Sequence, residues 1–317
     1  MFILRAALAL TVTALPLVYG TVRAEPSTPA AAQAPAPIRF TVVDQGTVGK
    51  PDVILLPGLT SGRWVWEAQA AKLAPDYRLH LLQVNGFAGQ PAGANATADP
   101  LLPALVEDLH AYIVTRRMRP IIVGHSLGGL LGLMLAAKYP QDVARLVIVD
   151  ASPFWGLMFG PTVTADSVRP MAQSMRDGTF SASPARREAS ERSIAQGLAL
   201  DPQARRRIME DGLASDAQVG GRAMYEDLTT DLRPALASIK TPTLVIYAYD
   251  PTLVFPDGTR PTAEAADAAY QSSYRTLPNV KLVRIDNARH FIMSDQPERL
   301  DEQLRRFLET TGVPHRR

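Results

Sequence analysis

One serine stands where the sequence pattern places a nucleophile. Ser126 is the centre of the pentapeptide G-H-S-L-G, which runs from Gly124 to Gly128. The short apolar run 121–123 precedes it and the long apolar run 127–139 follows it. This order predicts a strand, a sharp turn and a helix, the context in which G-x-S-x-G exposes a reactive serine. The glycines let strand and helix approach closely, and a helix N-terminus favours a developing negative charge.

The same pattern also fits a buried strand–helix unit whose glycines serve packing alone. A reactive serine further needs a base, because its hydroxyl is a weak nucleophile until a neighbour removes its proton. The chain has 5 histidines, at His80, His110, His125, His290 and His315. His290 follows a predicted strand, 281–285, on a short loop, which puts it at the same end of a parallel sheet as Ser126. We therefore expect His290 to be the base and the other four to be structural or solvated.

The rest of the chain must supply a sheet that positions these residues. Short apolar runs predict strands at 40–44, 53–56, 79–84, 146–149, 243–247 and 281–285. Helical patterns lie between and after them, at 64–74, 101–115, 263–274 and 297–310. Alternating strands and helices predict an α/β fold with a doubly wound, mostly parallel sheet.

The segment 152–234 interrupts this alternation, because it holds helical patterns and no convincing strand. The patterns lie at 167–178, 184–198, 203–214 and 216–230. Ligands of open α/β sheets bind beyond the carboxyl ends of the strands, where insertions of this kind occur. We therefore expect a helical cap within a domain that spans 38–317, although the helices could instead extend the scaffold.

The first residues have the pattern of a secretory signal peptide, predicted at 1–24. Arg5 provides the positive start, 6–19 is apolar but short for a membrane span, and 22–24 reads V-R-A, a typical cleavage site. An uncleaved anchor is the alternative. We expect a secreted or periplasmic protein without a stable membrane anchor after cleavage. The Pro/Ala-rich stretch 25–37 then reads as a linker.

Composition excludes several classes of function. Of 317 residues, 46% are hydrophobic and 20% are charged, which is ordinary for a globular protein. There is no cysteine, so disulfides, thiolate metal sites and cysteine nucleophiles are ruled out. The formal charge is only +2, from 33 basic and 31 acidic residues, so nucleic acid is not an expected partner. We expect no metal and no cofactor, since no ligand cluster or phosphate-binding loop is apparent.

Several segments together resemble the α/β-hydrolase fold superfamily, in particular its serine esterases, lactonases and perhydrolases. The matching segments are L-P-G-L at 56–59, G-H-S-L-G-G at 124–129, Y-A-Y-D at 247–250, and D-N-A-R-H-F at 286–291 followed by D-Q-P at 295–297. The resemblance covers 38–310 and is weakest in the cap. It implies a catalytic triad in the chain order Ser, Asp, His, with Ser126 and His290 as two of its members.

The resemblance favours Asp250 as the acid that orients His290. Asp250 follows the predicted strand 243–247 and precedes Pro251, the usual position in the family. Asp150 is the rival, since it directly follows the strand 146–149, where some relatives carry the acid. Asp286 is close to His290 in sequence and more suited to capping its own loop.

The resemblance also implies two backbone amides that bind the oxyanion. One belongs to Leu127, next to the nucleophile, and the other to Leu59, after Pro57 and Gly58. Many relatives have histidine where this chain has Pro57. Because the donor is a backbone amide, the substitution need not affect catalysis.

Large apolar side chains beside these loops are candidates for a substrate pocket, although each could equally belong to the core. They are Trp64, Trp66, Phe154, Trp155, Met158 and Phe159. The expected function is hydrolysis of a small-molecule carboxylic ester, or a lactone, through an acyl-enzyme on Ser126. The same triad could serve perhydrolysis or C–C or amide hydrolysis. A binding protein on a hydrolase scaffold is the alternative of a different class.

Overall fold

A computed structural model describes residues 39–160, 162–254 and 258–309. The predicted signal peptide and linker, at 1–24 and 25–37, lie outside the described residues, as does His315. In the ranges that are described, no helix is both long and apolar enough to cross a membrane.

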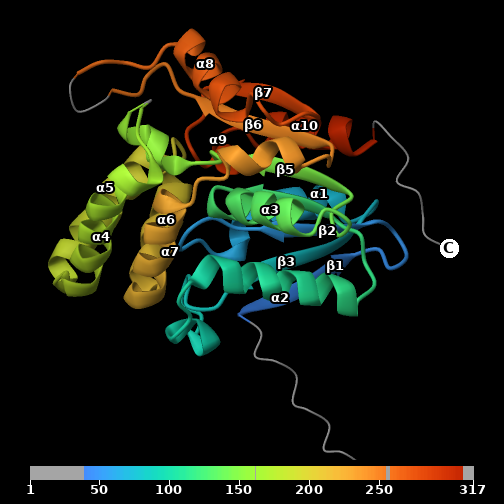
Figure 1. The fold of residues 1–317 in the computed structure, drawn as a ribbon, viewed down its shortest axis with the longest axis horizontal. Helices are drawn as coiled ribbons and strands as arrows, with labels where there is room; N and C mark the ends of the chain where they lie inside the picture. The colour runs from blue at the N-terminus through green and yellow to red at the C-terminus, as the bar shows by residue number, and fades with distance from the viewer. Residues whose placement is uncertain (1–38, 161, 255–257, 310–317) are drawn as a thin grey trace, which may run out of the picture. The chain divides into compact units, whose positions relative to one another are not determined.

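The sheet has seven strands in the order β1-β3-β2-β4-β5-β6-β7 (Figure 1). Only the pairing of β1 with β3 is antiparallel, and all other neighbours are parallel. This confirms the predicted doubly wound, mostly parallel sheet. The strands are β1 Phe40–Gly46, β2 Asp52–Leu56, β3 Arg78–Val84, β4 Ile121–His125, β5 Arg145–Val149, β6 Thr243–Tyr249 and β7 Val280–Asp286.

Helices cover both faces of the sheet because successive side chains of a strand point to opposite faces. In β2, Ile54 belongs to the buried cluster of one face and Leu55 to that of the other. The first face is covered by α2 Leu101–Thr115, α3 Leu127–Lys138 and α8 Ala263–Tyr274. The second is covered by α1 Glu67–Leu73, α9 Ile292–Asp295 and α10 Pro297–Glu309. The helix expected at 64–74 begins as a 3-10 turn, η1 Arg63–Trp66, and continues as α1.

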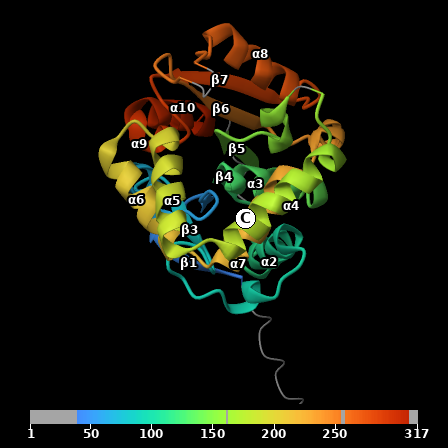
Figure 2. The same cartoon turned by 90° about the vertical axis from the view of Figure 1, so that its left-hand side faces the viewer.

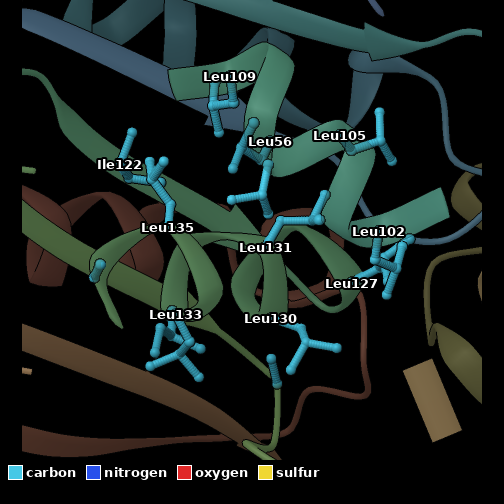
Figure 3. Close-up of a cluster of buried hydrophobic side chains, with 14 of the residues drawn as sticks. Leu56, Leu102, Leu105, Leu109, Ile122, Leu127, Leu130, Leu131, Leu133 and Leu135 are labelled. Atoms are coloured by element: carbon cyan, nitrogen blue, oxygen red, sulfur yellow. The ribbon is translucent and has the colours of Figure 1, made fainter. Parts of the chain in front are cut away.

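Helix α3, which follows Ser126, is apolar on all sides from Leu127 to Ala137, and most of these residues are buried. Leu131 and Leu135 point toward the α2 side, where Leu105 and Leu109 lie (Figure 3). Leu130 points the other way and is also buried. Packing on both sides holds the N-terminus of α3, and with it the serine, in a fixed position.

The segment predicted as a cap contains four helices, between β5 and β6. They are α4 Ala165–Ser181, α5 Pro184–Leu198, α6 Pro202–Ala214 and α7 Ala217–Thr229, preceded by the 3-10 turn η3 Trp155–Phe159 and followed by η4 Arg233–Ser238. Each helix starts where a side chain accepts a hydrogen bond from a free amide of the first turn. The capping residues are Thr164, Ser183, Asp201 and Asp216. Helix α4 packs on α7, and α5 packs on α6 (Figure 2).

These helices are attached to loops that follow the carboxyl ends of strands. Asp211 of α6 accepts hydrogen bonds from the Gly62 amide, at 2.7 Å, and from Trp64 Nε1, at 2.6 Å. The amide of Asp216 donates to the Gly86 carbonyl at 2.8 Å, in the loop after β3. The helices therefore lie at the end of the sheet where Ser126 and His290 are found.

Candidate active site

The turn between β4 and α3 has the strained geometry of a nucleophile elbow. Ser126 has φ of 53° and ψ of −122°, a region that residues with a side chain rarely adopt. A side chain at Gly124 would clash with the Gly128 carbonyl, and one at Gly128 would clash with the Leu56 carbonyl. Both glycines are therefore required for strand and helix to meet here, as expected from the sequence. The Ser126 amide donates to the Val149 carbonyl at 3.0 Å, which ties the turn to the end of β5.

The loop after β2 lies directly against the serine. A Cβ at Gly58 would lie 3.1 Å from Ser126 Cβ and 3.0 Å from His125 Nδ1. The next residue is Leu59, one of the two expected oxyanion donors. Within the described part of the chain, neither the Leu59 amide nor the Leu127 amide has an acceptor. Both amides thus flank the serine with their donors unused.

His290 is bound to an aspartate, and that aspartate is Asp150. His290 Nδ1 lies 2.7 Å from Asp150 Oδ2. The other carboxylate oxygen, Oδ1, accepts from the Ala248 amide at 2.9 Å and from the Tyr270 hydroxyl at 3.0 Å. Asp150 itself has a positive φ of 47°, at the end of β5. The Ala248 amide and the Tyr270 hydroxyl therefore hold the carboxylate that binds the imidazole, and no partner of His290 Nε2 is found among the described residues.

The prediction that Asp250 contacts His290 is wrong. Asp250 Oδ2 accepts from Arg289 Nε at 2.7 Å, and Oδ1 accepts from the amide and hydroxyl of Thr252 at 2.8 and 2.7 Å. Burial alone would raise the pKa of Asp250, but the hydrogen bonds from Thr252 and Arg289 outweigh it, and the pKa is lowered. Arg289, next to the histidine, therefore binds Asp250, and the imidazole of His290 binds Asp150. Asp286, the third candidate, pairs with Arg284 at 2.6 Å.

His125, inside the pentapeptide, contacts the histidine loop rather than solvent. Its Nε2 donates to the His290 carbonyl at 3.0 Å, and the two imidazole centroids are 4.6 Å apart. Burial and the nearby His290 hold the pKa of His125 well below its usual range, so it is neutral. The contact places the ring of His290 beside the residue that precedes Ser126. The other described histidines are remote: His80 binds Asp44 and Asp52, and His110 binds Asp142.

Two of the six predicted pocket residues lie at the site. The Trp155 indole packs edge-on against the His290 ring, with centroids 5.7 Å apart. Trp64 stacks on Phe291, with centroids 6.2 Å apart, and its Nε1 donates to Asp211. Trp155 therefore borders His290, whereas Trp64 joins the loop after β2 to α6.

The other four predicted pocket residues have different positions. Trp66 is fully buried under the sheet, and its Nε1 donates to the Leu56 carbonyl at 3.0 Å, so it is a core residue. Phe154 is also fully buried, in a cluster with Val168, Ala172 and Leu228. Met158 is 66% exposed and Phe159 is partly exposed, both on the surface of η3. None of these four has a ring or hydrogen-bond contact with His290 among the described residues.

Tyr270 and Arg289 are site residues that the sequence reasoning did not single out. Tyr270 lies on α8 and reaches Asp150 from 120 positions away in the chain. Burial and the charge of Asp150 raise its pKa well above the usual range, so it acts as a hydrogen-bond donor. No sequence signal indicates this contact. The role of Arg289 could have been inferred from the sequence. It is a cation directly before His290, so it can pair with a carboxylate that lies near the histidine loop.

Comparison with known proteins adds to this geometry. Residues 53–303 match the model of the family described as "Alpha/beta hydrolase family". A pimeloyl-[acyl-carrier protein] methyl ester esterase of Edwardsiella ictaluri is 28% identical over 63% of this chain and 74% of its own length. The same enzyme of Aromatoleum aromaticum is 36% identical, but over only 33% of this chain and 39% of its own length. The enol-lactonase structure from Burkholderia xenovorans superposes with a TM-score of 0.66 at 18% identity, over 85% of this chain and 96% of that one.

Proposed function

Since the chain belongs to the alpha/beta hydrolase family, we propose that it is a serine hydrolase that cleaves carboxylic esters, including lactones, through an acyl-enzyme on Ser126. The observation that carries the proposal is the 2.7 Å contact between His290 Nδ1 and Asp150 Oδ2, next to a serine in a strained turn. The methyl ester esterase activity of the relatives supports an ester as the substrate. We propose Asp150 in place of Asp250 as the acid of the triad.

In the proposed mechanism, Ser126 Oγ attacks the ester carbonyl while His290 Nε2 takes its proton. Asp150 stabilises the imidazolium that forms and keeps its Nδ1 proton in place. Collapse of the tetrahedral intermediate breaks the C–O bond, and His290 gives the proton to the departing alcohol. Water, deprotonated by His290, then attacks the acyl-enzyme, and the acid leaves with Ser126 restored.

The negative charge on the tetrahedral intermediate needs donors that are already in place. We propose the amides of Leu59 and Leu127 for this role, since both flank Ser126 without an acceptor of their own. Preorganised backbone amides are worth more here than water, because they need not reorient as charge develops. The N-terminus of α3 adds a favourable dipole.

We also propose that helices α4–α7 act as a cap that bounds the substrate site. Their attachments to the loops after β2 and β3 support this, as does the position of Trp155 beside His290. The cap would exclude water and select the substrate.

Labelling with a fluorophosphonate probe tests the proposal, because the probe reacts only with an activated serine. We expect labelling of Ser126 in the wild type and none in Ser126→Ala. Hydrolysis of p-nitrophenyl butyrate should fall at least about 10⁴-fold in that variant. Ser174→Ala, an exposed serine on α4, is the matched control and should behave as wild type. Wild-type activity in Ser126→Ala would disprove the mechanism, and a parallel assay with hydrogen peroxide as acceptor would reveal perhydrolysis.

A further inference from the structure

The turn that carries Leu59, one of the two proposed oxyanion donors, is strained. The Ser61 amide donates to the Gly58 carbonyl at 3.2 Å, which closes a tight turn with Leu59 and Thr60 at its centre. Thr60 has a φ of 54°, in the left-handed region that a β-branched residue rarely adopts. Strained backbone of this kind persists only where its surroundings hold it. The groups that hold this turn therefore also fix the direction of the Leu59 amide.

One support of the turn comes from the sheet. Gln83 of β3 is buried, its side-chain nitrogen donates to the Ser61 carbonyl at 3.2 Å, and its side-chain oxygen accepts from the Arg63 amide at 2.8 Å. Gly62 lies between these two residues, and its amide donates to Asp211 Oδ2 on α6 at 2.7 Å. Three consecutive residues of the loop are thus held alternately by the sheet and by a helix of the proposed cap.

Trp64 adds to the link between this loop and α6. Its Nε1 donates to the same oxygen of Asp211 at 2.6 Å, and the guanidinium carbon of Arg207, also on α6, lies 4.3 Å from the ring centroid. The ring stacks on Phe291, with centroids 6.2 Å apart, and Phe291 directly follows His290. Trp64 therefore joins the loop after β2 both to α6 and to the histidine loop.

The corner between α6 and α7 packs on the strained residue itself. Ser215, which ends α6, is buried, and its hydroxyl oxygen accepts from the Ala88 amide at 2.8 Å and lies 3.3 Å from the Thr60 carbonyl oxygen. A Cβ at Gly220, on α7, would lie 3.3 Å from Thr60 Cγ2. The contact of Asp211 with Gly62, two positions after Thr60, therefore belongs to a wider surface that supports the turn.

We propose that Asp211 and Trp64 are positioning residues for the oxyanion site. They hold the turn 58–61 so that the Leu59 amide points toward the carbonyl oxygen of an ester that reacts with Ser126. A preorganised amide stabilises the developing charge because it need not reorient, so loosening the turn should slow the chemical step more than it weakens substrate binding. The inference rests on the proposed function, and it gives α6 a part in stabilising the transition state.

The main test is Asp211→Ala, assayed with p-nitrophenyl butyrate. We expect kcat to fall about 10- to 100-fold, since a small displacement of a group that acts on the transition state has an effect of this size, while KM changes less than about threefold. Asp211→Asn keeps a side-chain oxygen that can accept from the Gly62 amide, so its kcat should stay within about threefold of wild type. Trp64→Phe keeps a ring for stacking and loses only the Nε1 donor, so kcat should fall about 3- to 10-fold.

Inhibition by 1,1,1-trifluoropentan-2-one measures the oxyanion site directly. Addition of Ser126 Oγ to its carbonyl carbon, with transfer of the serine proton to His290, forms a hemiketal whose oxyanion requires the same two amides. The inhibition constant should rise in Asp211→Ala by the same factor by which kcat/KM falls. The final extent of fluorophosphonate labelling counts the folded, competent sites, so kcat is expressed per competent site.

Glu226→Ala is the matched control. Glu226 lies on α7, is partly buried as Asp211 is, and accepts from the amides of Leu101 and Leu102 at 2.6 and 2.8 Å. It joins a helix of the proposed cap to the start of α2 by the same chemistry, but not to the loop after β2. Glu226→Ala should therefore lower the free energy of unfolding, as Asp211→Ala does, and keep kcat within about twofold of wild type.

A wild-type kcat and inhibition constant in Asp211→Ala would overturn the inference and would show that Gln83 alone holds the turn. An equal loss of kcat in Glu226→Ala would also overturn it, because the effect would then come from general loosening of the helices α4–α7. So would a raised KM with an unchanged kcat. If Asp211→Ala does not fold, Trp64→Phe decides, and wild-type values in that variant overturn the inference.

The wild type separates this inference from the proposed function. Ester hydrolysis that is equal in the wild type and in Asp211→Ala removes the positioning role and leaves the proposed function intact. If the wild type hydrolyses no ester and does not react with the fluorophosphonate, the proposed function fails and the positioning role fails with it.

Discussion

Asp150 and Asp250 follow neighbouring strands of one sheet, and both are nearly buried, at 8% and 5% exposure. They differ in the partner that reaches them from the histidine loop. Asp150 receives the imidazole of His290, and Asp250 receives the guanidinium of Arg289. Arg289, a permanent cation, and His290, a titratable base, are adjacent in the chain, and each binds a different carboxylate. The position of an aspartate after a strand therefore does not determine its role. Its role depends on which residue of the histidine loop contacts it.

The other contacts of the two carboxylates fit this division. Asp150 accepts from Ala248 and Tyr270, groups of the sheet and of α8, and so belongs to the rigid scaffold. Asp250 binds Thr252 in its own loop, and its arginine also donates to the Gln196 carbonyl in α5 at 2.6 Å. The first arrangement orients a base. The second fastens the histidine loop to the helices of the proposed cap.

The largest expected effect separates the two acids directly. Asp150→Asn should lower kcat for p-nitrophenyl butyrate about 10³- to 10⁴-fold, because an amide can no longer stabilise the imidazolium or hold its tautomer. Asp250→Asn is the matched control and should lower kcat by less than about tenfold. Steady-state kinetics on both folded variants provide the measurement. A larger loss in Asp250→Asn than in Asp150→Asn would restore Asp250 to the triad.

Asp250→Asn should instead act on stability. Removing one partner of a buried ion pair leaves Arg289 uncompensated, at a cost of about 3 kcal/mol in the free energy of unfolding. The pKa of Asp250 is lowered in the fold. Its stabilising contribution is therefore present above pH 4 and is lost as pH falls below that value toward the folded-state pKa.

Urea unfolding at pH 7 and at acid pH measures this difference. The gap between wild type and Asp250→Asn should be largest at pH 7 and should shrink in acid. Adding Arg289→Met to Asp250→Asn should recover part of the loss, since both charges are then gone. A gap that does not change with pH would mean that the ion pair is not its source.

The sequence was sufficient for much of this fold and for part of the site. The apolar runs at β2, β4 and β5 are buried on both faces, so their hydrophobicity alone identified them. The motif G-x-S-x-G predicted that Gly124 and Gly128 lie where there is no room for a side chain. Local patterns of this kind are visible in one stretch of chain.

The sequence did not show which aspartate contacts His290, because these residues come from different strands and loops. Asp150 and Asp250 both follow apolar strands, and only the three-dimensional course of the loop at 287–291 decides which one meets His290. The long aromatic side chains posed a similar problem. Trp66 and Trp155 are the same residue type and each follows a predicted strand, yet Trp66 lies in the core and Trp155 contacts His290. Burial at such positions depends on tertiary contacts that no periodicity encodes.

The smallest expected effect concerns the hydroxyl group of Tyr270, which supports Asp150 but touches neither Ser126 nor His290 among the described contacts. Tyr270→Phe removes one hydrogen bond to Asp150 Oδ1 and leaves the Ala248 amide in place. One neutral donor to a carboxylate contributes roughly 1 to 2 kcal/mol, so kcat should fall about 5- to 30-fold. Tyr274→Phe is the control, because that hydroxyl donates to the Ala151 carbonyl and not to a carboxylate. A loss of the size expected for Asp150→Asn would place Tyr270 within the catalytic machinery, whereas equal behaviour of the two tyrosine variants would show that Oδ1 needs only the backbone amide.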